Sequence, residues 1–135
     1  MSTNLGPSAE PTKNPVLRFV KSVACALSGI SFTFKTERHF KFHVLAAAVA
    51  IGLGLYLQLS PIEWASIVFA IGLVLISELF NTALERLCDE TANGSWCELV
   101  RRAKDSAAGA VLISAAVALI VGIIILGIPL IHRFF

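Results

Sequence analysis

Charged side chains are scarce in this 135-residue sequence. Asp, Glu, Lys and Arg make up 15% of it, against about 25% in soluble domains. Hydrophobic residues make up 56%, and the mean hydropathy is +0.79. A small water-soluble core does not require this much apolar surface. The composition therefore excludes an ordinary soluble domain and predicts an integral membrane protein.

Several familiar binding and catalytic signatures are also missing. The sequence has no Gly-rich phosphate loop, kinase catalytic loop or serine nucleophile elbow. It has no basic cluster with interleaved aromatics of the kind that binds nucleic acid. Cys25, Cys88 and Cys97 form no CxxC pair, so we interpret them as free thiols. No short apolar run follows a basic start, and we predict no cleavable signal peptide.

Helical periodicity begins after a polar, proline-containing tail. Residues 1–14 have little to bury and are predicted to be disordered. From 15 to 36, apolar residues recur at steps of four and three, which indicates a helix with one apolar face. We interpret it as an amphipathic surface helix with its basic side toward the lipid headgroups. Packing against the protein's own core fits the periodicity equally well.

Three transmembrane helices are predicted in the rest of the chain, at about 40–59, 61–89 and 104–131. The apolar run of the first span is shorter than the roughly 20 residues that a span needs, so its helix must begin before that run. Ser60 and Glu63 have the spacing of a capping box around Pro61, which predicts a tight turn and a new helix. Residues 15–135 would thus form one all-α membrane domain.

The basic residues predict the orientation of these spans. Ten of the 11 Lys and Arg lie in the N-terminal segment or at 86–104, and the 60–63 turn has none. By the positive-inside rule, the N-terminus and the second connection face the cytoplasm.

Small residues repeat every four positions in the third span: Ser106, Ala110, Ser114, Ala118 and Gly122. Such a ridge lets helices approach closely in lipid. We expect a homo-oligomer, although packing within one chain also explains the ridge.

A polar stripe follows the apolar half of the second span: Glu78, Asn81, Glu85 and Asp89. At 100° per residue they lie within about 80° of one another. A charge facing lipid near mid-membrane costs about 2.5–3.5 kcal/mol, so a site facing protein is favoured. The carboxylates could hold Mg²⁺ or accept a proton. Alternatively the helix leaves the membrane after Ser77, which we favour for Asp89 and Glu90 but not for Glu78.

Two further clusters lie at the same predicted membrane face. Lys104 and Asp105 adjoin small residues, and basic residues there could hold a phosphate. Glu37 lies among basic residues before the first span and could form an ion pair at the interface. The residues alone therefore fit either metal-assisted chemistry on an anion or a pathway for protons or cations.

Two longer motifs carry a resemblance. "ELFNTALERLCDE" at 78–90 and "AKDSAAGAVL" at 103–112 resemble the signature of the prokaryotic diacylglycerol kinase and undecaprenol kinase family. "ERHFKFH" at 37–43 is similar to the family's segment before its first span. The likeness covers about residues 16–130. It implies a homotrimer with three spans and a surface helix per chain, in the bacterial inner (plasma) membrane.

The resemblance also implies an activity, namely transfer of the γ-phosphoryl group of ATP to a lipid hydroxyl at the cytoplasmic interface. It assigns roles to seven residues: Glu78 as the catalytic base, Glu37 and Glu85 as ligands of Mg²⁺ with ATP, Asn81 as a positioning group, and Arg18, Lys104 and Asp105 as nucleotide contacts. Cys25, Ser28 and Cys97 depart from the family pattern in the leader and loop.

His43 bears on the choice of lipid. Diacylglycerol-specific members tend to have glutamate at this position and undecaprenol-type members histidine, so we predict undecaprenol as the substrate. Diacylglycerol is the alternative, and a small ion or proton transporter lined by the same carboxylates is the alternative from another class. His43 could also be only a helix-end residue.

Overall fold

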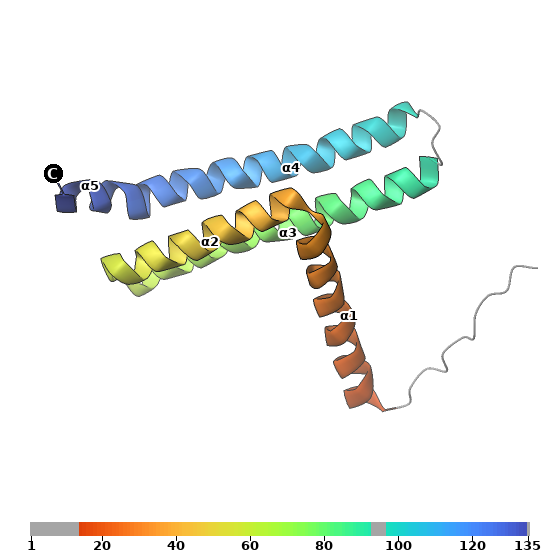
Figure 1. Cartoon of the computed structure of the whole chain (residues 1–135), viewed down its shortest axis with the longest axis horizontal. Helices are drawn as coiled ribbons and strands as arrows, with labels where there is room; N and C mark the ends of the chain where they lie inside the picture. The colour runs from red at the N-terminus through yellow and green to blue at the C-terminus, as the bar shows by residue number, and fades with distance from the viewer. Residues whose placement is uncertain (1–13, 93–96, 135) are drawn as a thin grey trace, which may run out of the picture. The chain divides into compact units, whose positions relative to one another are not determined.

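A computed structural model describes residues 14–92 and 97–134, and these residues are helical almost throughout. The predicted disordered tail at 1–14 lies outside the described residues except for Asn14. The described residues form six helical segments in chain order (Figure 1): α1 (Pro15–Thr36), α2 (Arg38–Leu57), α3 (Pro61–Ala92), α4 (Glu98–Gly122), η1 (Ile123–Gly127) and α5 (Ile128–Phe134).

The chain divides into two units, and the first ends at Phe32. Its described part is α1 without the last turn. The start of α1 is fixed by its sequence: Pro15 occupies the first helical position, and Asn14 Oδ1 accepts a hydrogen bond from the Val16 N–H at 3.0 Å. Large apolar side chains such as Phe19 are exposed along this helix.

In the second unit, which runs from Thr33, α3 packs against both α2 and α4. The buried residues of α3 recur at helical spacing: Ile67, Ala70, Val74, Glu78, Thr82 and Cys88. This spacing gives α3 one buried face, on which Glu78 follows three apolar residues. Many large apolar side chains elsewhere in the unit are exposed, as expected for helices that face lipid.

Four helical stretches in the described part of the chain are long and apolar enough to cross a membrane: Pro15–Thr36, Arg38–Leu57, Pro61–Ala92 and Glu98–Arg133. The all-helical membrane architecture predicted from the sequence is therefore confirmed. The sequence predicted three spans and a surface helix, whereas length and apolarity alone also admit α1 as a span.

The turn between α2 and α3 lies where the sequence places it. Gln58 ends α2 in the left-handed region at φ 57°, and the Ser60 N–H donates to Glu63 Oε2 at 2.8 Å. The hydrogen bond from Ser60 to Glu63 is the glutamate half of the predicted capping box. Trp64 lies against the last turns of α2, where a Cβ added to Gly54 would come within 2.9 Å of the indole ring. The turn therefore depends on a glycine at 54.

The last stretch contains a π-helical segment, η1, which ends two residues before Pro129. Proline has no N–H to donate back along the helix, and a π-bulge is one way to accommodate that lost bond.

Candidate active site

Glu78 is a buried carboxylate on the packed face of α3. Its relative exposure is 5%, and its Oε1 atom lies 3.3 Å from Nε2 of His43 on α2. The side chain of His43 is 18% exposed, so it lies nearer the surface than that of Glu78, which is 6% exposed. A buried carboxyl group is costly unless it has a polar partner, and the imidazole of His43 is the polar group beside it.

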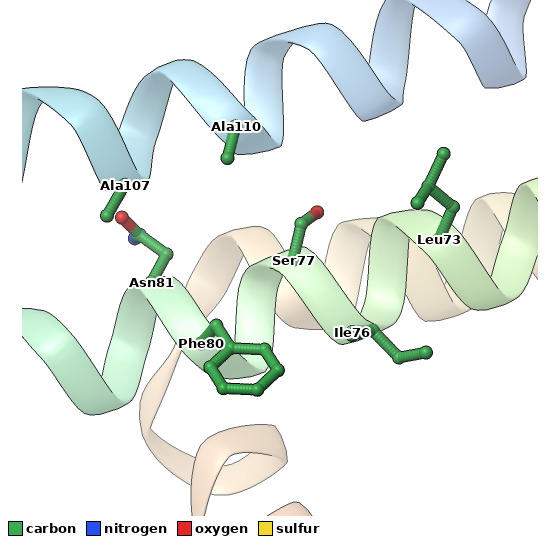
Figure 2. Close-up of a pocket in the computed structure, with 7 residues that line it drawn as sticks. All are labelled: Leu73, Ile76, Ser77, Phe80, Asn81, Ala107 and Ala110. Atoms are coloured by element: carbon green, nitrogen blue, oxygen red, sulfur yellow. The ribbon is translucent and has the colours of Figure 1, made fainter.

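Asn81 lies one turn further along α3, on the side that faces α4 (Figure 2). With Ser77 it supplies the polar atoms of an open groove of about 330 Å³ between the two helices, and the other lining residues are Leu73, Ile76, Phe80, Ala107 and Ala110. Its Oδ1 atom is buried and has no hydrogen-bond partner within residues 14–92 and 97–134. Such an atom costs about 1–3 kcal/mol, so it is suited to accept a hydrogen bond from a ligand.

Glu37 caps the start of α2 and is bound to α3. Arg86 Nη2 donates to Glu37 Oε1 at 2.8 Å and to Thr36 Oγ1 at 3.1 Å. The hydrogen bond from Arg86 is the main reason that the pKa of Glu37 lies below its usual 4.5, and Thr36 adds to the effect. Arg86 is the residue after Glu85 on α3. The contact between Arg86 and Glu37 therefore joins Glu37 to the part of α3 that carries Glu85.

Lys104 links α4 to α3. Its Nζ atom donates to Asp89 Oδ1 at 2.8 Å, and the charge of Glu85 acts on it as well. Asp105 is bound by Arg101 at 2.7 Å, and Arg101 also bonds Glu98. These pairs lie at the end of the second unit that is remote from the turn between α2 and α3.

The structure thus pairs several residues predicted from the sequence. Asp89, which we expected to be solvated, is exposed but is also ion-paired with Lys104. The contact between His43 and Glu78 was missed, as was Arg86 as the partner of Glu37. The sequence offers one signal for the first, because Phe40 precedes His43 by three residues and so shares its helical face. The structure buries Phe40, which shows that this face is packed. Arg18 lies on α1 in the first unit, and its nucleotide contact stays a prediction.

A magnesium site is compatible with the donor groups present. The described residues contain no group of three or more His, Cys, Asp or Glu side chains arranged to hold a metal ion. Mg²⁺, however, usually takes only one or two carboxylates and completes its shell with phosphate oxygens and water. Glu37 and Glu85 are carboxylates of the required chemistry, so they fit an ion that arrives with a nucleotide.

The helices and ionisable groups define a small membrane protein with a buried carboxylate and several cations at one end. Residues 24–126 match the family described as prokaryotic diacylglycerol kinase. The chain is 41% identical over 113 residues to undecaprenol kinase of Bacillus subtilis (strain 168), covering 84% of this chain and 91% of that protein. It is 43% identical over 97 residues to diacylglycerol kinase of Synechocystis, covering 72% of this chain and 55% of that protein.

Diacylglycerol kinase of Escherichia coli (strain K12) is more distant, with 29% identity over 109 residues, 81% of this chain and 88% of that protein. The chain belongs to the prokaryotic diacylglycerol kinase family. It is accordingly a membrane lipid kinase, and membership of a kinase family implies that it uses ATP.

Proposed function

We propose that this protein transfers the γ-phosphoryl group of ATP to the hydroxyl of undecaprenol at the cytoplasmic face of a bacterial inner membrane. The observation that carries the proposal is the buried carboxylate of Glu78, held beside His43 on the packed face of a membrane helix. A lipid alcohol is weakly acidic, and a carboxylate at its own depth in the membrane is a suitable acceptor for the hydroxyl proton.

Phosphoryl transfer requires little covalent chemistry from the protein. The lipid oxygen forms a bond to the γ-phosphorus while the bond from that phosphorus to the β,γ-bridging oxygen breaks, and the hydroxyl proton passes to Glu78. Positioning is therefore the main requirement. Asn81 Oδ1, which has no hydrogen-bond partner among the described residues and lies one turn from Glu78, supports a role for Asn81 in orienting the reacting hydroxyl.

The nucleotide would occupy the charged end of the second unit. Glu37 and Glu85 would hold Mg²⁺, which would neutralise phosphate charge, and Lys104 and Asp105 would contact the nucleotide. For Arg18, on the first unit, a contact with the nucleotide is what the family resemblance implies. In the structure, Glu37 is bound to Arg86 and Lys104 to Asp89. Binding would therefore exchange internal ion pairs for contacts with phosphate and metal.

We also propose three spans per chain, formed by α2, α3 and the stretch from α4 to α5, with α1 as a surface helix and the N-terminus in the cytoplasm. A homotrimer would cover the apolar side chains that one chain leaves exposed. One member of the small-residue ridge is used within the chain, because Ser114 Oγ lies 2.7 Å from Ser77 Oγ. Ser106 and Ala110 of the ridge are exposed and would be available to a neighbouring copy.

Undecaprenol is preferred as the substrate because the relative named undecaprenol kinase is matched over 91% of its length. The Synechocystis relative is slightly more identical but is matched over only 55% of its length. Diacylglycerol is the second candidate, since that relative and the Escherichia coli one are named diacylglycerol kinase.

The test is incubation of purified protein with γ-labelled ATP, Mg²⁺ and either lipid in the same detergent. We expect labelled undecaprenyl phosphate, and we expect Glu78→Gln to lower its formation by at least about 10²-fold, as for loss of an acid–base group. Glu90→Gln removes an exposed glutamate from the same helix and is the matched control. Exclusive labelling of diacylglycerol would correct the substrate, and labelling of neither lipid would refute the proposal.

A further inference from the structure

The proposed reaction creates a problem of proton disposal at Glu78. Each phosphoryl transfer would leave the hydroxyl proton on a carboxyl group whose side chain is only 6% exposed. That carboxyl must lose the proton before it can accept another. Turnover therefore requires a path for the proton from Glu78 to water, and this requirement rests on the proposed function.

His43 lies where such a path must begin. Its Nε2 atom is 3.3 Å from Glu78 Oε1, and its side chain is three times as exposed, at 18% against 6%. Imidazole is the side chain that most readily gains and loses a proton near neutral pH. A separation of 3.3 Å lies just outside the range of about 2.6–3.2 Å for direct proton transfer, so a small approach of the two side chains is sufficient.

Within the described residues, His43 is the side chain that the ion pairs place beside Glu78. Among the described residues, Glu78 has His43 as its one ion-pair partner, and His43 has no charged side chain other than Glu78 within ion-pair distance. The carboxylate of Glu37 is bound to Arg86 and that of Asp89 to Lys104, so neither of these acids contacts the pair.

We propose that His43 is a proton-relay residue that carries the hydroxyl proton from Glu78 to water. After phosphoryl transfer, the Oε1–H bond of Glu78 breaks and an Nε2–H bond of His43 forms. The Nδ1–H bond of the imidazolium then breaks, and that proton goes to water. Exchange of the remaining ring proton from Nε2 to Nδ1 through water restores the tautomer that can accept the next proton. One proton leaves for each phosphoryl group transferred.

The relay predicts a loss of turnover that a small base can repair. His43→Ala should lower kcat on the order of 10²-fold, at the lower end of the range for acid–base groups, while KM for ATP and lipid stays within about twofold. Added imidazole should restore kcat at least about tenfold in His43→Ala and leave the wild-type rate unchanged. His132→Ala is the matched control, because His132 is exposed on α5, beside Arg133, which stacks on Tyr56 at the far end of α2.

His43→Gln separates a relay from a packing role. Glutamine nearly fills the space of histidine and can hydrogen-bond to Glu78, but it does not accept a proton near neutral pH. We expect it to lose kcat as His43→Ala does, and the loss should shrink as the concentration of a small basic buffer rises. Thermal unfolding of both variants checks that they are folded, and if His43→Ala is not, His43→Gln with the buffer series decides.

Two results overturn the relay while the proposed function stands: wild-type kcat in folded His43→Gln, or a slowed His43→Ala that imidazole does not restore. Absence of any phosphorylated lipid with the wild-type protein overturns the proposed function itself, and the relay falls with it. The wild-type reaction therefore distinguishes the two failures.

Discussion

Lys104 on α4 donates a 2.8 Å hydrogen bond to Asp89 on α3. The proposed function assigns the same ammonium group of Lys104 to the nucleotide. The side chains of Lys104 and Asp89 are 35% and 68% exposed. An exposed pair of this kind is worth only about 0.2–1 kcal/mol, so a phosphate can displace Asp89 at little cost.

Two substitutions that break this same ion pair should therefore have different effects on ATP. Lys104→Met removes the cation and should raise KM for ATP by about tenfold or more, since a charge-assisted bond contributes roughly 1.5–3 kcal/mol. Asp89→Asn frees the lysine and should leave KM unchanged or lower it. The measurement is initial rate against ATP concentration at saturating lipid. Equal KM values in the two variants would mean that Lys104 only joins the helices.

Substitution of Asn81 should lower kcat without lowering the stability of the fold. Its buried Oδ1 has no partner in the part of the chain that the structure describes, so removing the amide costs the fold little or nothing. We expect Asn81→Ala to unfold at the wild-type temperature or above it, while kcat falls by about tenfold, the value of one lost hydrogen bond of roughly 1.4 kcal/mol.

Ser114→Ala is the control for Asn81→Ala, because we expect it to lower stability and leave kcat unchanged. It removes the hydrogen bond between Ser77 and Ser114, which should cost on the order of 0.6 kcal/mol in a membrane protein and should leave kcat as it is. Thermal unfolding and kinetics of both variants in one detergent make the comparison. A destabilised but fully active Asn81→Ala would show that the amide serves packing.

The sequence predicts the elements of this fold better than it predicts their partners. Pro61 and the capping spacing locate the start of α3, and the apolar periodicity locates its buried face. Periodicity gives the direction in which a side chain leaves its own helix, however, and does not say which helix lies there. Glu78 and Asp89 belong to one predicted stripe, yet the first contacts α2 and the second contacts α4.

Ion pairs between distant residues are hidden for the same reason. Arg86 and Glu37 are separated by 49 positions, and their contact depends on how α2 and α3 pack. The resemblance pointed to Glu37 and Glu85 as groups of one site, but it did not indicate that Arg86 holds Glu37.

The pair formed by Glu37 and Arg86 should make stability depend on acid pH. Because Arg86 lowers the pKa of Glu37 below 4.5, the folded state favours the carboxylate. The resulting stability is complete above the unfolded pKa and is lost as pH falls through the folded one. Arg86→Gln lacks it, so the difference in unfolding free energy from wild type should be under about 1 kcal/mol at neutral pH and should shrink below about pH 4.5.

Chemical unfolding of wild type and Arg86→Gln at a series of pH values measures this difference. Glu37→Gln should abolish the same pH-dependent increment, which assigns it to this carboxyl group. A difference that stays constant down to about pH 3 would place the effect of Arg86 elsewhere.

Gly54 is required by the turn between α2 and α3, whereas Gly52, two positions earlier in α2, is not confined. A Cβ at 54 would lie 2.9 Å from the Trp64 ring and 3.0 Å from Leu59, while a Cβ at 52 meets nothing within 4 Å. Because the indole is rigid, Gly54→Ala should cost about 1–3 kcal/mol, as overpacking does. Gly52→Ala should be neutral or stabilising, by up to about 1 kcal/mol, because alanine favours the helix. Thermal unfolding of the two variants in one detergent tests this, and equal midpoints would show that Trp64 moves aside without cost.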